Sequence, residues 1–421
     1  MGELPEPAWI EARLVAARPR VLAALLRYFR DLERAEEAFQ EACLRALTKW
    51  RENGPPRDAE AWLILVGRNL TLDHIRRASR LTELADEAPS AERVDVEADY
   101  AERLDESHYR DDILRLLFTC CHPELPATQQ IALALRVVSG LSVERIARAF
   151  LIGERAMEQR ITRAKARLAA AGLPFEAPGP AERSERLAAV ATVVYLVFNE
   201  GYSAFDLESE RAGLCEEGIR LARLLLRIFP SEPEMMGLLA LMLLQHSRRK
   251  ARFDKQGQII LLEKQERSLW SRTMIDEALT MLDKAMLHRR PGPYQIQAAL
   301  AAMHARAERP EDTDWAEIEA LYGALERHEP SPVVTLNRAV AVSKVRGPEA
   351  ALALVETLAE PLGGYFYFHG LRGALLKQLG RTREAQRAFT EAIGLAGSPA
   401  EAAHIREHLD ELLAFQETNR L

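Results

Sequence analysis

The sequence has few cysteines, few aromatic residues and no long apolar run. Four cysteines in 421 residues do not make a disulfide framework. No stretch reaches the roughly 18 apolar residues that a membrane span needs, so we predict no membrane partner. The N-terminus also lacks the basic, apolar and small-residue order of a secretion signal. We therefore expect a cytoplasmic protein.

Motifs for catalysis or metal binding are also scarce. The sequence has no nucleophile motif, no phosphate-cradling glycine loop and no HExxH motif. Residues 118–125, FTCCHPEL, place Cys120, Cys121 and His122 side by side. Neighbouring side chains on a helix diverge by about 100°, and no second Cys or His pair follows at zinc-finger spacing. We interpret these as buried structural residues, and we expect no catalytic residue, cofactor or metal.

Helical periodicity is present almost throughout, because apolar residues recur at spacings of three and four and alternating patterns are rare. The sequence predicts an all-α protein, and its length predicts two or three domains. The first helices are expected at 10–30, 33–50 and 59–80, with a Gly/Pro-rich loop at 52–58. The third helix is expected to bury much of an apolar stripe formed by Trp62, Leu65, Val66, Leu70, Leu72 and Ile75.

Charge is unevenly distributed in this acidic chain, whose net charge is -7. Residues 81–112 carry twelve acidic residues and three arginines, which is typical of a flexible tether. On either side, residues 61–80 hold four arginines against Asp73, and residues 145–168 hold seven basic residues against two acidic ones. Two basic helices that flank an acidic linker are the footprint of two DNA-contacting modules.

The second basic segment, 141–168, has the pattern of a helix-turn-helix. Ser142 is placed to cap a first helix, and residues 152–154 are expected to form the turn. The second helix would bury Met157, Ile161, Ala164 and Leu168 and present its basic side chains to the major groove of DNA.

The C-terminal half follows a Gly/Pro-rich boundary at 170–185 and contains a repeat. Ala316, Ala350 and Ala385 recur at a period near 34 residues, which is typical of tetratricopeptide-like helix pairs with small residues where the helices cross. We expect pairs at 294–327, 332–359 and 365–396, followed by a capping helix at 399–416.

These segments resemble a known family. Residues 33–47, ERAEEAFQEACLRAL, then 61–77, AWLILVGRNLTLDHIRR, then the 141–168 motif resemble an extracytoplasmic-function (ECF) bacterial sigma factor in order and spacing. The later segments resemble the ECF subgroup with a C-terminal tetratricopeptide-like extension: YLVFNEGYSA at 195–204, RSLW at 267–270, GPYQIQAALAAMHA at 292–305 and SPVVTLNRAVAV at 331–342.

The resemblance implies four parts and a set of site residues. The parts are a region-two domain at 1–82, an acidic linker at 83–112, a region-four domain at 113–172 and an extension at 181–421. The expected contacts with core RNA polymerase are Glu36, Glu37, Gln40 and Glu41. The expected contacts with the minus-ten promoter element are Trp62, Asn69, Asp73, Arg76, Arg77 and Arg80. The expected contacts with the minus-thirty-five element are Arg155, Glu158, Gln159, Arg160, Arg163 and Lys165.

Several alternatives stay open at this level. Taken alone, the helix that carries Asn69 and the nearby arginines favours a plain solvated face. Many ECF factors have a basic residue at the position of Glu158, which here can accept from cytosine or form a salt bridge between helices. The 199–202 stretch, with Asn199, Glu200 and Tyr202, is either a small polar site or a helix end that fixes the extension against region four.

The implied function is promoter-directed initiation with core RNA polymerase and promoter DNA as partners. The extension would regulate it by binding a peptide, a protein or a small molecule, or by holding regions two and four together. One rival is a helix-turn-helix regulator that never binds polymerase. Another is an enzyme that uses Glu200, Glu263 and Glu266 as acid-base groups.

Overall fold

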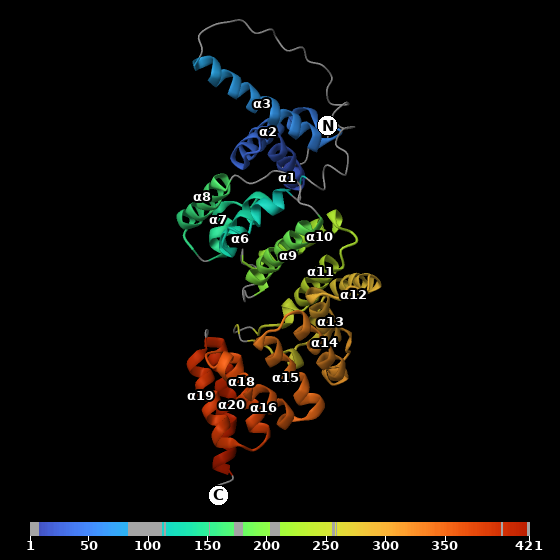
Figure 1. Ribbon diagram of the computed structural model, residues 1–421, viewed down its shortest axis with the longest axis vertical. Helices are drawn as coiled ribbons and strands as arrows, with labels where there is room; N and C mark the ends of the chain where they lie inside the picture. Colours follow the sequence, from blue (N-terminus) through green and yellow to red (C-terminus); the bar gives the residue numbers. More distant parts are fainter. Residues whose placement is uncertain are drawn as a thin grey trace, which may run out of the picture. The chain divides into compact units, whose positions relative to one another are not determined.

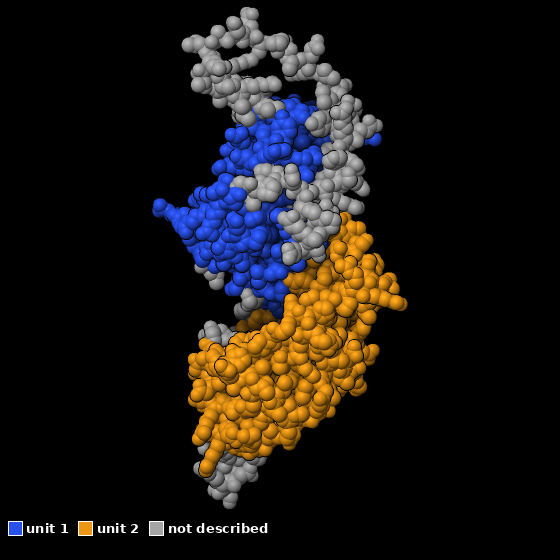
Figure 2. Space-filling view, viewed as in Figure 1, with its two compact units in different colours: residues 1–221 blue, residues 222–421 orange. Residues whose placement is uncertain are grey.

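The computed structural model describes residues 8–82, 112, 115–150, 152–171, 180–202, 211–254, 257, 259–396 and 399–418. Helices make up nearly all of this part of the chain (Figure 1). It contains no strand beyond an isolated bridge between Phe253 and Ile259. The predicted all-α class is confirmed. The chain divides into two compact units, Met1–Leu221 and Ala222–Leu421 (Figure 2).

The first unit begins with a three-helix bundle. Its helices are α1 (Ala8–Phe29), α2 (Leu32–Asn53) and α3 (Ala59–Thr82), and each packs against the other two. Aspartates begin two of them. The Asp31 carboxylate accepts from the amides of Glu33 and Arg34, and the Asp58 carboxylate accepts from those of Glu60 and Ala61. Such N-caps satisfy amides that have no partner within the helix, so the predicted loop at 52–58 fixes where α3 starts.

The buried side of α3 differs from the predicted stripe. Leu63, Ile64 and Gly67 are buried, whereas Trp62 and Leu65 are half-buried, as are Val66 and Leu70. The side chains of Leu72 and Ile75 lie outside the described part of the structure. The prediction missed the most buried residues of α3 because residues 61–66 are uniformly apolar, so periodicity alone could not choose the face. The buried face is the one that carries Gly67, which has no Cβ and so lets the α2 backbone at Ala38 approach closely.

A second helical bundle holds the predicted helix-turn-helix. It contains helical residues 115–120, α6 (Ala127–Val137), α7 (Val143–Ala149) and α8 (Glu154–Ala170). Ser142 caps α7 by accepting from the Arg145 amide at 3.2 Å, as predicted. The predicted inward face of α8 is confirmed, because Met157, Ile161, Ala164 and Leu168 are all buried. Helix α7 ends at Ala149 and α8 begins at Glu154, so the first helix ends earlier than the predicted turn at 152–154 implies.

Helix α9 (Pro180–Tyr202) follows and packs against α6. The boundary between the two units falls within α10 (Gly213–Ile228). The second unit continues with α11 (Pro233–Ser247) and α12 (Arg272–Leu287). Short 3-10 turns lie at η1 (Arg249–Ala251), η2 (Leu262–Lys264), η3 (Arg267–Leu269) and η4 (Pro310–Asp312).

The C-terminal part consists of successive helix pairs. They are α13 (Pro293–Arg306) with α14 (Trp315–His328), α15 (Pro332–Arg346) with α16 (Pro348–Glu356), and α18 (Phe366–Gln378) with α19 (Thr382–Leu395). The short α17 (Ala359–Leu362) precedes the last pair, and α20 (Pro399–Thr418) packs on α19. The predicted helix pairs and the capping helix are therefore confirmed.

The small-residue prediction holds at one repeat. Ala385 is fully buried beside Phe389, but Ala350 is half-buried and Ala316 is exposed. The buried small residue of the second pair is the next one, Ala351. Gly380, in the LGRTREA turn, has φ +70°, a left-handed conformation that favours glycine and ends α18.

Candidate functional site

One face of α2 presents an acidic and apolar strip to solvent. Glu37 and Gln40 are exposed and Glu41 is half-buried. Leu44, which is 67% exposed, and Leu47, which is 43% exposed, lie about two turns further along the same face. We call these five residues the α2 strip. Sequence reasoning missed the two leucines, although their seven-residue offset from Glu37 and Gln40 was a usable signal. Acidic groups around exposed leucines are suited to a protein partner.

Asn69 lies on α3, just beyond its buried segment, and its side chain is exposed. Arg68 donates to the Asn69 amide oxygen at 3.4 Å. Trp62 lies two turns earlier on the same face of α3. It is half-buried, with its ring centroid 5.5 Å from that of Trp50. The side chains of Asp73, Arg76, Arg77 and Arg80 lie outside the described part of the structure, so their predicted roles stay predictions.

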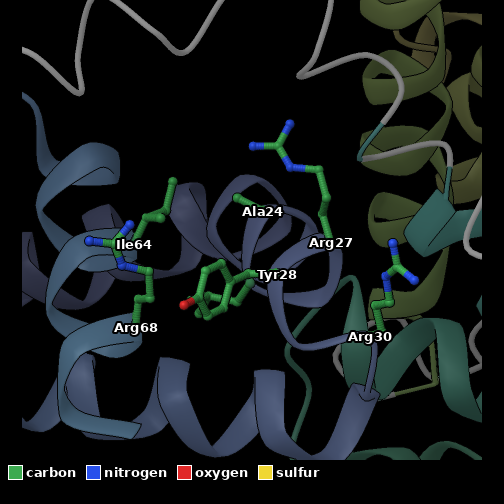
Figure 3. A pocket seen from close by; sticks show the side chains of 7 residues that line it. Ala24, Arg27, Tyr28, Arg30, Ile64 and Arg68 are labelled. Atoms are coloured by element: carbon green, nitrogen blue, oxygen red, sulfur yellow. The ribbon is translucent and has the colours of Figure 1, made fainter. Parts of the chain in front are cut away.

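A basic and aromatic pocket lies between α1 and α3 (Figure 3). Its volume is about 280 Å³, and its lining residues are Ala24, Leu25, Arg27, Tyr28, Arg30, Ile64 and Arg68. The Arg68 guanidinium lies 5.7 Å from the centroid of the Tyr28 ring, which is 49% exposed. An exposed ring among guanidinium groups can stack a base while the cations hold its phosphates. No sequence pattern indicated this pocket, because Tyr28 and Arg68 are 40 residues apart.

Helix α8 carries its predicted DNA-contacting residues opposite its buried face. Arg155, Glu158, Gln159 and Arg163 are exposed, and Arg160 is half-buried. Arg163 donates to the Gln159 amide oxygen at 3.3 Å, one turn away. Within the described residues the exposed Glu158 has no ion-pair partner, which weighs against the salt-bridge interpretation and leaves its carboxylate available to a base.

Two predicted site residues contact each other instead of solvent. Glu36 of α2 is 5% exposed, and its Oε2 atom lies 2.5 Å from Lys165 Nζ of α8. Its other oxygen, Oε1, lies 3.4 Å from a terminal guanidinium nitrogen of Arg18 on α1. The Lys165 contact is an ion pair without hydrogen-bond geometry. We call Arg18, Glu36 and Lys165 the Glu36 triad.

Arg18 extends the triad to α6. Its Nε atom donates to the Val137 carbonyl at 2.9 Å, and a terminal nitrogen donates to the Arg136 carbonyl at 3.2 Å. A cation at the carbonyl end of a helix is stabilised by the helix dipole. Burial is the main cause that lowers the pKa of Arg18, and the Glu36 carboxylate opposes that shift.

A second ion pair joins the same two bundles. The buried Asp112 carboxylate lies 3.1 Å from Arg115 and 3.2 Å from Arg27, on the rim of the α1–α3 pocket. Asp112 is the last residue of the predicted acidic linker. Both pairs therefore place a group from the region-four side against a charged group of region two.

The FTCCHPEL segment has the environment of a structural turn. Cys120 and Cys121 are buried, and burial raises the pKa of the Cys121 thiol to about 12 and that of Cys120 well above its usual range. Metal ligation requires the thiolate, which this environment disfavours. The His122 Nδ1 atom accepts from the Glu124 amide at 3.3 Å. Across the described ranges, no three His, Cys, Asp or Glu side chains gather as a metal site.

The three carboxylates of the enzyme alternative each have a local partner. Glu200 pairs with Arg211 at 3.4 Å, Glu263 pairs with Lys344 at 2.9 Å, and Glu266 accepts from the Ser268 hydroxyl. Helix α9 ends at Tyr202, so the helix-end interpretation of the 199–202 stretch agrees with the structure.

None of the helices within the described ranges has the length and apolarity needed to cross a bilayer.

Comparison with protein families identifies the two N-terminal bundles. Residues 14–81 match Sigma-70 region 2, and residues 115–168 match Sigma-70 region 4. Residues 186–286 match a family of unknown function, DUF6596. The chain belongs to the sigma-70 family, as an ECF-type sigma factor with a C-terminal helical extension. Its class gives it a role in transcription initiation, with core RNA polymerase and promoter DNA as partners.

One curated protein and one solved structure match the chain. An uncharacterised protein of Rhizobium meliloti (strain 1021) is 68% identical over 412 residues, which cover 98% of this chain and 97% of that protein. The crystal structure of yeast Tom70 matches with a TM-score of 0.36 and 12% identity, over 91% of this chain and 81% of that one. That score is too low to support a shared fold.

Proposed function

We propose that the chain binds core RNA polymerase through the α2 strip and Glu36, and directs it to promoters through Asn69 on α3 and the exposed face of α8. The observation that carries this proposal is the exposure of two unlike surfaces on the two sigma bundles. The α2 strip combines carboxylates with leucines, as a protein partner requires. The α8 face combines arginines with Glu158 and Gln159, as a base-reading helix requires.

Region two would act on melted DNA. An exposed amide such as that of Asn69 can pair with the edge of a base that has left the duplex. The adjacent pocket offers Tyr28 for stacking and Arg68 for phosphate binding, which favours a single strand over a duplex. The basic end of α3, with Asp73, Arg76, Arg77 and Arg80, would continue this path.

The extension would regulate the sigma regions from within the same chain. Its first helix, α9, packs on α6 of region four, and Arg186 lies 5.8 Å from the centroid of the Phe118 ring. A ligand of the helical repeats, such as a peptide or a small molecule, would change initiation by altering this contact. We place the protein in the cytoplasm, because its proposed partners act there.

In vitro transcription tests the proposal. The full chain, mixed with core polymerase and promoter templates, should start RNA synthesis at a defined position, whereas core alone should not. No binding to core, together with tight binding to duplex DNA, would instead favour the regulator that never contacts polymerase. No change in start-site activity for Arg186→Ala and for a chain ending after residue 172, both checked for folding by circular dichroism, would argue against regulation by the extension.

Two substitutions separate the promoter surfaces. Asn69→Ala should weaken open-complex formation more than binding to duplex DNA, because the amide acts on an extruded base. Arg163→Ala should reduce footprinting of the upstream element and leave core affinity unchanged. Equal losses in both assays for Asn69→Ala would contradict its assigned role.

A further inference from the structure

The Glu36 triad places the proposed polymerase contact and a proposed DNA contact against each other. Glu36 is 5% exposed, and the Lys165 side chain is 27% exposed. A buried carboxylate cannot meet polymerase, and an amine paired with it is not free for a phosphate. The conformation described here is therefore incompatible with both roles of these two residues.

Promoter geometry leads to the same result. The minus-thirty-five and minus-ten elements lie about 25 base pairs apart, or about 85 Å of duplex. Region two and region four meet at a 2.5 Å contact between Glu36 and Lys165, so together they cannot reach both elements. The thirty residues of the 83–112 linker can span at most about 100 Å when extended, which is enough for separated regions.

The contacts are built into the fold on both sides. Gly140 has φ +73°, and a Cβ there would lie 2.7 Å from Arg18 Cδ, so a glycine leaves room for this side chain. Arg18 also lies 5.1 Å from the centroid of the Phe39 ring. The Asp112–Arg27 pair adds a second attachment. Each region thus supplies the charge that the other's partner would supply: Lys165 stands in for a polymerase cation, and Glu36 and Asp112 stand in for DNA phosphates.

We propose that the Glu36 triad is an autoinhibitory lock, which holds the free sigma factor closed until core polymerase takes Glu36 from Lys165. The inference rests on the proposed function for its consequence, because the lock matters only if α2 binds polymerase. Because only open molecules bind core polymerase, the apparent affinity is the affinity of the open form multiplied by the fraction of molecules that are open. A variant that shifts the closed–open ratio tenfold toward the open form raises that affinity by up to about tenfold.

Lys165→Ala in the full chain tests the lock in an assay without DNA. The variant should bind core polymerase about tenfold more tightly than the unaltered chain. Arg167→Ala is the matched control, since it removes one positive charge from an exposed position on the same helix. It should leave core affinity unchanged. Equal affinities for all three chains, or an equal gain in both variants, would overturn the proposal.

A second measurement needs no polymerase. In the unaltered chain, reductive methylation followed by mass spectrometry should modify Lys165 severalfold more slowly than the exposed Lys49 of α2. Glu36→Gln keeps the size of the side chain but removes its charge, so it should speed modification of Lys165 without affecting Lys49. Equal rates at both lysines in the unaltered chain would show that the lock does not form.

The two measurements distinguish a failure of the lock from a failure of the proposed function. A chain that never binds core polymerase contradicts the proposed function, yet the lysine rates still report whether the two regions are closed. Tight core binding that is insensitive to Lys165→Ala contradicts the lock alone. Unchanged melting temperatures for Lys165→Ala and Glu36→Gln would show that the changes in core affinity and in lysine modification do not come from unfolding.

Discussion

Gly67→Ala should destabilise region two, although this substitution usually stabilises a helix. Gly67 lies within α3, where alanine is favoured over glycine by about 1 kcal/mol. A Cβ at this position would lie 2.7 Å from the Ala38 carbonyl oxygen and 3.4 Å from Leu25 Cδ1. The oxygen belongs to the backbone of α2 and cannot rotate away, so the two helices must separate. Overpacking costs about 1–3 kcal/mol, which exceeds the gain in helix propensity by up to about 2 kcal/mol.

Hydrogen exchange followed by mass spectrometry can measure this loss in α2 and α3 alone, apart from the other bundles. The matched control is Gly323→Ala in the middle of α14, where no described atom lies within 4 Å of the new Cβ. There the higher helix propensity of alanine acts without a clash, so the free energy of opening measured by hydrogen exchange should increase by up to about 1 kcal/mol. Increased protection of α3 in Gly67→Ala would refute the close approach of α2.

Three further predictions concern other parts of the chain. Leu44→Ala should weaken core binding by about tenfold without lowering the melting temperature, because Leu44 is exposed in the free chain and would be buried against polymerase. Glu158→Gln should change the preference at one base of the upstream element while the salt dependence of binding stays nearly constant, as measured by binding to a template series. His304 has a pKa lowered to about 4, chiefly by burial and then by Arg248 and Arg267. As the pH falls, His304 is therefore protonated in the unfolded chain before it is protonated in the folded chain. The free energy of unfolding should fall by about 2 kcal/mol between pH 7 and pH 5. Urea titrations at both pH values should show a smaller fall for His304→Phe.

Local sequence signals predicted much of this structure. Ser142, the spacing of Met157 and Ile161, and the basic residues between them were enough to place α7 and α8, because a cap and a 3.6-residue period act within a few turns. The helix pairs of the extension followed from the repeat in the same way. The buried face of α3 did not, since it depends on how closely α2 approaches at Gly67.

The burial of Glu36 was also beyond local signals. Its neighbours in the sequence match a polymerase-binding helix, and its periodicity puts it at the edge of the α2 strip. Its partners Arg18 and Lys165 lie 18 and 129 residues away, so only the packing of two separate bundles brings them together. The exposure of Leu44 has a similar origin, because a helical pattern cannot say which apolar residues the fold leaves uncovered.

The triad is suited to opening because Glu36 has two cations. When Lys165 leaves, Arg18 still neutralises the carboxylate, so opening does not strand a buried charge. Removing one partner from a buried pair costs about 3–5 kcal/mol, and an exposed pair is worth about 0–1 kcal/mol. A contact with a retained second cation falls between these limits, at about 1–3 kcal/mol. A partner that binds with nanomolar affinity supplies about 12 kcal/mol, which is enough to break this contact and still hold the open chain. Without Lys165, closure would rest on the Arg18 bonds to α6 and on the Asp112–Arg27 pair, and without Arg18, loss of Lys165 would leave the Glu36 carboxylate uncompensated.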